Sequence, residues 1–217
     1  MAELNERIKK HTDSLMLRYP VLEELRDSIT DAYLLMEETY KNDGKLLIAG
    51  NGGSAADAEH MTGELMKRFK KARPIKKDLS DRLIAIDRDI GSRLSLNLDR
   101  ALMAIPLTAH DALTTAYIND ADGYGVFAQQ LFGFGREGDV FLAISTSGNS
   151  SNIINAAVLA KALGIKTIGL TGRSGGRLKE FADVCVRVPE DETYRIQELH
   201  LPIYHTWCLM LEDRFFG

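Results

Sequence analysis

Residues 140–163 read VFLAISTSGNSSNIINAAVLAKAL, and this stretch decides the fold. The apolar run Val140–Ile144 comes directly before a loop of hydroxyl-bearing and small residues. Apolar residues at helical spacing follow from Ile153 onward. A short continuous apolar run predicts a buried strand, and the spacing after the loop predicts a helix. The stretch is therefore a strand, a loop at its carboxyl end, and a helix.

The same unit occurs on both sides of this stretch. LLIAG (46–50) predicts a strand, followed by the loop NGGS (51–54) and a helix from Ala55 to about Phe69. Alternation of short apolar strands with helices predicts an α/β fold, a doubly wound and mostly parallel sheet with helices on both faces. Later elements continue the pattern: strand 166–170, the loop TGRSGGR, helix 178–182, strand 184–188 and a last helix from about 193 to 216.

The chain is expected to form a single domain over residues 1–217. Residues 1–43 predict two N-terminal helices, and residues 44–217 form the α/β core with an inserted segment at 71–104. The insertion is preceded and opened by the basic run KRFKKARPIKK (67–77). We expect this run to be an exposed loop, the alternative being that its charge guides an anionic ligand. The apolar residues that follow are partly at helical spacing, so the segment is expected to be packed rather than free.

The composition excludes several classes of protein. The chain has 217 residues, 45% hydrophobic and 27% charged, with a net charge of −4, so no basic field favours nucleic acid or an anionic membrane. Two cysteines, Cys185 and Cys208, are too few for a disulfide framework and indicate a reducing compartment. The polar N-terminus lacks the apolar core of a signal peptide, and no run is long enough to span a bilayer. We expect a cytoplasmic protein.

Two loops at strand ends carry the residues of a candidate binding site. Ser145, Thr146, Ser147 and Ser150 place four hydroxyls around Gly148, at the start of a helix. A helix N-terminus offers free N–H groups and partial positive charge, which suit a phosphate. The alternative is a turn in which Ser147 or Ser150 caps the helix. The NGGS loop also places small residues at the start of a helix, where Ser54 could instead cap that helix. Two such loops at strand ends together favour one shared ligand.

Titratable side chains at helical spacing form a second candidate group. His60 and Glu64 are four residues apart and share a helix face. Gln197 and His205 lie on the last helix, with His200 between them. From residue type alone, His60 and Glu64 could equally be an exposed surface pair. A single histidine on a helix, such as His200 or His205, could equally be packed in the core or solvated.

Four motifs together are similar to those of a known family. GNGGSAADAEH, ISTSGNSSNIINAA, LTGRSGG and RIQELH with a later histidine resemble the phosphoheptose isomerases of the sugar isomerase (SIS) domain family. The resemblance runs from about Gly44 to the C-terminus, and the insertion at 71–104 departs from shorter members. It implies an aldose–ketose isomerase that converts sedoheptulose 7-phosphate to D-glycero-D-manno-heptose 7-phosphate through an enediolate, supplying heptose for surface polysaccharide such as lipopolysaccharide.

The resemblance also assigns roles to residues. Glu64 and His205 match the acid–base pair, and the 145–150 loop would hold the phosphate. Zinc is implied in some members, through positions that match His60, Glu64, Gln197 and His205. The family assembles as a homotetramer with active sites at subunit interfaces. The positions expected to contact substrate are Asn51, Gly52, Gly53, Ser54, Glu64, Asn119, Asp120, Ser145, Thr146, Ser147, Ser150 and Gln197.

Several points stay open at the level of sequence. On one straight helix, Gln197 and His205 would lie about 12 Å apart, so a shared zinc strains both side chains unless Pro202 bends or breaks the helix or a neighbouring subunit contributes. Thr193-Tyr194 stands where some members carry an aspartate, which leaves the sugar less certain than the reaction. His110 and Asp111 are interpreted as a helix start. The alternatives are a non-catalytic phosphosugar sensor, a protein that binds the replication initiator DnaA, or an isomerase of a shorter phosphosugar.

Overall fold

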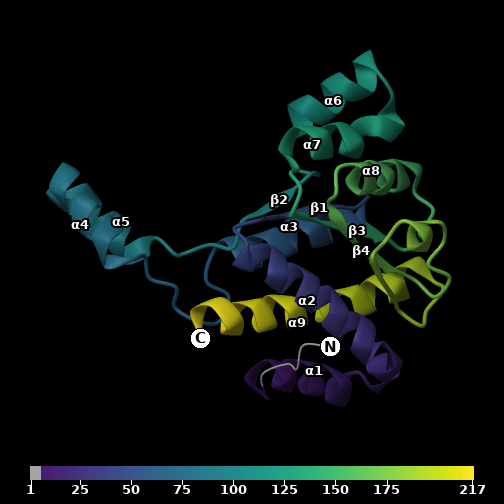
Figure 1. Ribbon diagram of the computed structural model, residues 1–217, viewed down its shortest axis with the longest axis horizontal. Coiled ribbons are helices and arrows are strands. Elements are labelled where there is room, and N and C mark those ends of the chain that lie inside the picture. Colours follow the sequence, from purple (N-terminus) through teal and green to yellow (C-terminus); the bar gives the residue numbers. More distant parts are fainter. Residues whose placement is uncertain (1–5) are drawn as a thin grey trace.

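The computed structural model describes residues 6–217, and at its centre is a parallel sheet with the strand order β2-β1-β3-β4-β5 (Figure 1). Every strand pair in this sheet is parallel. The predicted doubly wound α/β fold is confirmed. The strands are β1 (Leu46–Ala49), β2 (Ala104–Pro106), β3 (Val140–Ser145), β4 (Lys166–Thr171) and β5 (Val184–Arg187).

The sheet is covered on both faces because its central strands are apolar throughout. In β1, Leu46 and Ile48 belong to one buried cluster, whereas Leu47 and Ala49 belong to another. Alternate side chains of a strand point to opposite faces, so the two clusters lie on the two sides of the sheet. Parallel sheets require this double cover.

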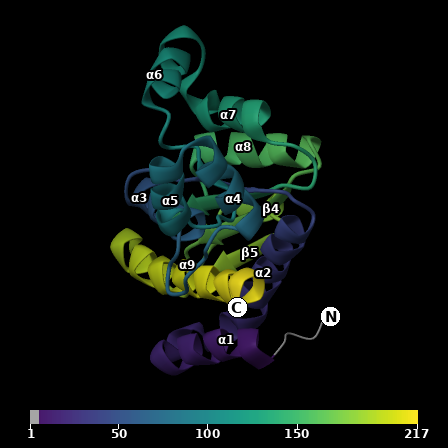
Figure 2. The same cartoon turned by 90° about the vertical axis from the view of Figure 1, so that its left-hand side faces the viewer.

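Helices cover both faces of the sheet (Figures 1 and 2). The first cluster contains residues of four helices and the second contains residues of two, and α6 lies beyond α7. On the first face are α1 (Glu6–Arg18), α2 (Arg26–Lys41), α3 (Gly53–Met66) and α9 (Thr193–Phe216); on the second are α7 (Val126–Phe134) and α8 (Ser151–Ala162), with α6 (Asp111–Asp120) outside them.

The helices α3 and α9 lie side by side and run in the same direction. The side chain of Gln197 lies against Gly53, and further along both helices His205 lies beside His60. Helix α9 continues through Pro202, whose carbonyl accepts the hydroxyl of Thr206 at 2.8 Å. Pro202 therefore does not break the helix.

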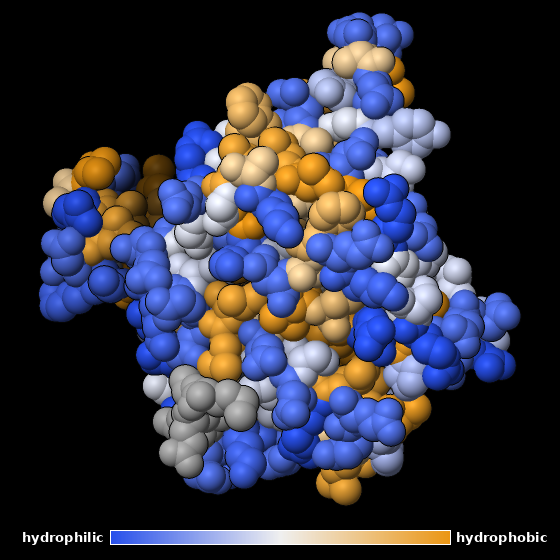
Figure 3. Space-filling model, turned by 45° about the vertical axis from the view of Figure 1, so that its right-hand side comes forward, coloured by the Kyte–Doolittle hydropathy of each residue, from blue (hydrophilic) through white to orange (hydrophobic). Residues whose placement is uncertain are grey.

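The insertion forms a helical hairpin that projects from the body of the protein (Figures 1 and 3). Its helices, α4 (Lys77–Ile86) and α5 (Arg88–Asn97), pack mainly against each other. Their helical character and their packing agree with the prediction, although the two helices pack on each other and leave Ile86 84% and Leu96 81% exposed. The ends are pinned together, because Arg100 N–H donates to the Arg73 carbonyl at 2.7 Å.

The basic run at 67–77 is only partly the exposed loop that was predicted. Lys70 and Lys76 are exposed, but Arg73 is fully buried and pairs with Glu212 at 2.9 Å. Lys71 pairs with Asp213. These two pairs neutralise part of the run and tie it to α9 (Thr193–Phe216).

Smaller differences from the sequence predictions concern short elements. The strand β2 was not anticipated, and the helix expected at 178–182 is a single 3₁₀ turn, η3 (Leu178–Glu180). Pro20 opens a further 3₁₀ turn, η1 (Pro20–Leu25), before α2. Among residues 6–217, no helix is both long and apolar enough to cross a bilayer. The assignment of residues 1–217 to one domain stays a prediction.

Candidate active site

The candidate site begins where the strand order reverses, between β1 and β3. In doubly wound sheets, ligands bind beyond the carboxyl ends of the strands at this switch point. The NGGS loop and the 145–150 loop follow these two strands. Asn51 and Asn152 join the loops through two amide hydrogen bonds of 3.0 and 2.9 Å. The two predicted loops are therefore neighbours. Asn152 was not predicted as a site residue, although it lies within the motif ISTSGNSSNIINAA.

The hydroxyl loop at 145–150 is ordered by its own side chains. Ser145 Oγ lies 3.0 Å from Ser150 Oγ, and Ser147 Oγ accepts the amide of Asn149 at 3.1 Å. Ser150 is the N-cap residue of α8, but its side chain makes no capping hydrogen bond. The capping-turn alternative therefore fails for Ser150, and Ser147 binds a loop amide, not a helix amide. This leaves the dipole at the start of α8 for an anion.

Gly148 holds this loop against the loop after β4. Its φ of +65° lies in the left-handed region, and a Cβ there would collide with the Gly175 carbonyl. The Gly148 carbonyl accepts Leu178 N–H at 2.9 Å. A cavity of about 230 Å³ opens between the two loops. Its lining is Thr146, Ser147, Asn149, Gly172, Arg173, Ser174, Glu190, Asp191 and Ile196.

The NGGS loop makes a tight bend, and the side chain of Gln197 from α9 packs against it. Gly52 has a φ of +56° and is the N-cap of α3. Ser54 is 3% exposed and lies within the first turn of α3, with no side-chain cap at this helix, so the predicted capping role is wrong. A Cβ on Gly53 would lie 2.6 Å from Gln197 Nε2, which shows that the Gln197 amide lies directly on this glycine.

The predicted acid–base residues lie together between α3 and α9. His60 Nε2 is 3.4 Å from Glu64 Oε1 and also 3.4 Å from His205 Nε2. The His60 and His205 rings meet edge to face, with centroids 4.9 Å apart. The shared face of His60 and Glu64 is therefore confirmed, and α9 adds His205. Their catalytic and substrate-binding roles stay predictions.

Burial lowers the pKa of two histidines on α9, His200 and His205. Burial and the neighbouring His60 lower the pKa of His205 below its ordinary value of 6.5. A neutral imidazole at neutral pH can both donate and accept a proton, as acid–base chemistry at sugar oxygens requires. His200 is fully buried, and burial lowers its pKa to about 4. His200 is thus a packed, neutral histidine of the core.

Tyr204, which the sequence did not single out, contacts His60 and links it to Asp57. The Tyr204 hydroxyl lies 3.0 Å from His60 Nδ1 and donates to Asp57 Oδ1 at 3.2 Å. Burial, followed by Asp57, raises the pKa of Tyr204, so the phenol stays protonated. Tyr204 precedes His205 on α9, but no motif marked it, because its contact depends on how two distant helices pack.

A buried ion pair fixes the C-terminal halves of the two helices. Arg73 donates to the backbone carbonyls of Glu64 and Leu65, at 3.1 and 2.8 Å, and to Glu212 Oε1 at 2.9 Å. Glu212 also accepts the backbone amides of Phe69 and Lys70 at 2.9 Å each. Arg73 therefore supports the backbone that carries Glu64.

The predicted zinc ligands are of suitable chemical types, but they are not gathered around one point. Among residues 6–217, no three His, Cys, Asp or Glu side chains are placed to hold a metal ion as they stand. The two 3.4 Å separations at His60 Nε2 do match the spacing of about 3.3 Å between ligands of tetrahedral zinc. Gln197 instead lies against Gly53, at the start of α3, and is separated from His60 by about two turns of that helix. A three-ligand site would need Glu64 and His205 to rotate toward a common point.

Asn119 and Asp120 lie apart from these groups. Both are exposed near the end of α6, where Asn119 donates to Asp120 at 2.8 Å. Figures 1 and 2 place α6 on the far side of the sheet from α9. Within one chain the structure does not bring these residues to the acid–base cluster.

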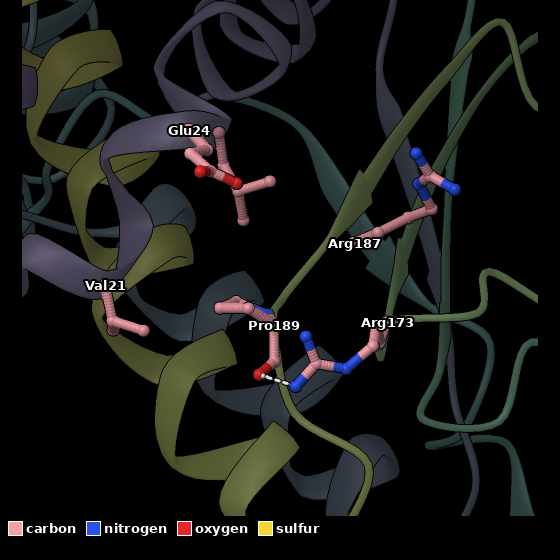
Figure 4. A pocket seen from close by; sticks show the side chains of 6 residues that line it. Val21, Glu24, Arg173, Arg187 and Pro189 are labelled. Atoms are coloured by element: carbon pink, nitrogen blue, oxygen red, sulfur yellow. Dashed lines mark hydrogen bonds between the residues drawn. The ribbon is translucent and has the colours of Figure 1, made fainter.

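A second cavity, of about 270 Å³, lies between η1 and the end of β5 (Figure 4). Arg173 turns toward the Pro189 carbonyl there and shares its guanidinium with Asp191. No predicted site residue lines this cavity, so it is not part of the candidate site. Its lining is Val21, Glu24, Leu25, Arg173, Arg187 and Pro189.

Comparison with known proteins places this fold and site in a defined class. The family model of the SIS domain matches residues 13–88 and 89–172. A curated protein named phosphoheptose isomerase 2, from Campylobacter jejuni, is 40% identical over 220 residues, covering 100% of this chain and 96% of its own length. The phosphoheptose isomerase of Aneurinibacillus thermoaerophilus is 39% identical over 216 residues, covering 98% and 96%.

Solved structures agree with these relatives. A phosphoheptose isomerase from Neisseria gonorrhoeae is 32% identical, with a TM-score of 0.73, covering 96% of this chain and 98% of its own. One from Francisella tularensis is 32% identical, with a TM-score of 0.74 and coverage of 96% and 97%. The sheet and its strand-end loops are thus those of a SIS domain protein. Within the SIS domain family, the chain belongs to the phosphoheptose isomerases, as its motifs predicted.

Proposed function

We propose that the protein is an aldose–ketose isomerase that converts sedoheptulose 7-phosphate to D-glycero-D-manno-heptose 7-phosphate. The observation that carries this proposal is the Glu64 carboxylate 3.4 Å from His60, which in turn lies 3.4 Å from His205, in a chain that belongs to the phosphoheptose isomerases. A non-catalytic member has no need of this acid–base set. The non-catalytic alternative is therefore not favoured.

The reaction moves one proton between carbons and another between oxygens. Glu64 would take a proton from C1 of the ketose while an acid protonates the oxygen on C2, which gives an enediol. Return of the carbon proton to C2, with loss of the proton from the oxygen on C1, gives the aldose. His205, whose pKa is lowered by burial and by His60, would serve the oxygens as a neutral imidazole.

The phosphate would bind at the hydroxyl loop. The loop places Ser147 at the rim of the cavity and leaves the N-terminus of α8 without a hydroxyl cap. Asn51 and Asn152 join this loop to the start of α3. The sugar chain would then run from this loop past Gly53 and Gln197 toward Glu64.

We also propose zinc as a cofactor, held by His60, Glu64 and His205 with Gln197 or another donor. Zinc would polarise the substrate carbonyl and stabilise the enediolate charge. The donor types and two ligand separations support this proposal. A Glu64 that binds zinc would be a weaker base, so metal and base roles compete for the same carboxylate.

The assembly we propose is a homotetramer with active sites at subunit interfaces. The position of Asn119 and Asp120 supports it, because both are exposed on α6 and separated from the acid–base cluster of their own chain. A neighbouring copy would bring them to the substrate. Free thiols at Cys185 and Cys208 support a cytoplasmic location, where the product would supply heptose for lipopolysaccharide.

The test is direct measurement of the isomerisation. Metal-analysed protein is incubated with sedoheptulose 7-phosphate, with and without a chelator, and aldose formation is followed by NMR. We expect aldose from the wild type, and loss of activity on chelation that added zinc restores. If no aldose forms with added zinc but a shorter ketose phosphate is converted, the proposed substrate is wrong. If no phosphosugar is converted, the proposal that the protein is an isomerase is wrong.

A further inference from the structure

Asp57, His60 and Tyr204 form a hydrogen-bonded chain that the acid–base roles above do not use. Asp57 and His60 are one turn apart on α3, and Tyr204 reaches them from α9. The Tyr204 hydroxyl donates to Asp57 Oδ1 at 3.2 Å and lies 3.0 Å from His60 Nδ1. Tyr204 is fully buried, so this side of the imidazole is shielded from water.

The number of protons in this chain determines the direction of each hydrogen bond. An ionised carboxylate only accepts hydrogen bonds, and a phenol carries one proton. Because Tyr204 gives its proton to Asp57, its oxygen has only lone pairs left for His60. The proton in the contact between Tyr204 and His60 must then belong to His60 Nδ1.

A neutral imidazole has one N–H, so a proton on Nδ1 leaves Nε2 bare. His60 Nε2 is the atom that faces Glu64 Oε1 and His205 Nε2, each at 3.4 Å. We propose that Tyr204, held by Asp57, is a positioning residue that keeps His60 in the Nδ1–H tautomer, with its Nε2 lone pair directed at the reacting centre. This inference rests on the proposed function, since it gives the isomerase a fixed acceptor there.

The arrangement has a clear chemical use. A bare Nε2 accepts a proton from His205 or from a substrate hydroxyl, and it is also the form of histidine that binds a metal. The opposite tautomer would direct an N–H at both groups and could do neither. Partners that fix a histidine tautomer in this way are commonly worth about 10–100-fold in activity or metal affinity.

The ionised form of Asp57 sets the direction of this hydrogen-bonded chain, because a carboxylate only accepts hydrogen bonds. Burial raises the pKa of Asp57 above its ordinary value, and the hydrogen bond from Tyr204 and the neighbouring His60 offset only part of this effect, so the tautomer is measured well above the ordinary range of a carboxyl group. A protonated Asp57 would donate to Tyr204, and Tyr204 would then donate to His60 Nδ1. His60 would carry its proton on Nε2, so the two cases give opposite tautomers.

The tautomer can be read directly by NMR, independently of catalysis. Protein labelled with ¹⁵N-histidine and freed of metal is studied by long-range ¹H–¹⁵N correlation, at about 1.5 pH units above the ordinary histidine pKa of about 6.5. The resonances of His60 are assigned from their loss in His60→Gln. We expect Nδ1–H and a bare Nε2 in the wild type, and a shift toward Nε2–H in both Tyr204→Phe and Asp57→Asn.

Tyr40→Phe is the matched control. Tyr40 is also buried and donates one hydrogen bond, to the Met103 carbonyl at 3.2 Å, away from His60. Tyr204→Phe should lower kcat by about 10-fold or more with a smaller change in KM, and Tyr40→Phe should change neither the tautomer nor kcat.

The outcomes separate this inference from the proposed function. An Nε2–H tautomer in the wild type, or an unchanged tautomer in Tyr204→Phe, would overturn the inference even in an active isomerase. A wild type without isomerase activity but with the expected tautomers would overturn the function and leave the hydrogen-bond assignment standing.

Discussion

Glu212→Gln should destabilise the protein strongly while changing few atoms. The substitution removes the charge that balances Arg73, whose side chain is 0% exposed and lies 2.9 Å from Glu212. Removing one partner of a buried ion pair typically costs about 3–5 kcal/mol. Arg73 keeps its two carbonyl acceptors, so we expect the lower end, about 3 kcal/mol. For a chain of this length that lowers Tm by about 6–12 °C.

The assay is thermal unfolding followed by circular dichroism at one fixed protein concentration, because assembly also shifts Tm. The matched control is Asp81→Asn, which breaks an exposed pair with Lys77 and should change Tm by no more than about 2 °C. A loss of less than about 2 °C in Glu212→Gln would refute the view that Arg73 is left buried and unbalanced. Replacing both Arg73 and Glu212 by apolar residues should recover much of the loss.

Acid gives a second test of the same pair. Burial alone would raise the pKa of Glu212, but the backbone amides of residues 69–71 and the Arg73 guanidinium hold it below its ordinary 4.5. A depressed pKa means that this stabilisation is fully present above about pH 4.5 and is lost as the pH falls through the folded-state pKa. Stability should therefore fall less steeply below pH 4.5 in Glu212→Gln than in the wild type.

Three substitutions test the candidate site. Gly148→Ala should cost at least about 1–3 kcal/mol of stability and impair substrate binding, because its φ is positive and a Cβ meets the Gly175 carbonyl; Gly133→Ala, with open space around it, should be neutral or stabilising. Ser147→Ala should raise KM about 10-fold with kcat little changed, and an unchanged KM would remove Ser147 from the phosphate site. Glu64→Gln should lower kcat at least about 100-fold with substrate binding retained, whereas the exposed Glu198→Gln should stay active; substantial turnover in Glu64→Gln would end its role as base.

The sequence predicted the core of the fold well because the signals there are local. A strand such as Val140–Ile144 is apolar at every position, and the small residues after it mark where it ends. The pairing of His60 with Glu64 followed from one helix turn. Both features need no knowledge of what lies across the molecule.

The rest depends on contacts between distant segments. Arg73 was interpreted as part of an exposed basic run, because its partner Glu212 lies 139 residues away. Tyr204 carried no motif, since its contact with His60 arises only when α9 packs on α3. Gln197 was grouped with His205, although helix geometry places it beside Gly53. Asn152 alone had an available signal, since it lies in the motif ISTSGNSSNIINAA, shortly after the hydroxyl loop.

The parallel course of α3 and α9 limits which insertions and deletions the chain can accept. Gly53 and His60 of α3, and Phe69 shortly after its end, meet Gln197, His205 and Glu212 of α9 in the same order along the chain. One residue added between Gln197 and His205 would rotate the later part of α9 by about 100° and advance it by about 1.5 Å. The acid–base cluster and the Arg73 ion pair would then be lost together. Change in length is therefore confined to segments such as the projecting hairpin, whose two ends are already pinned to each other.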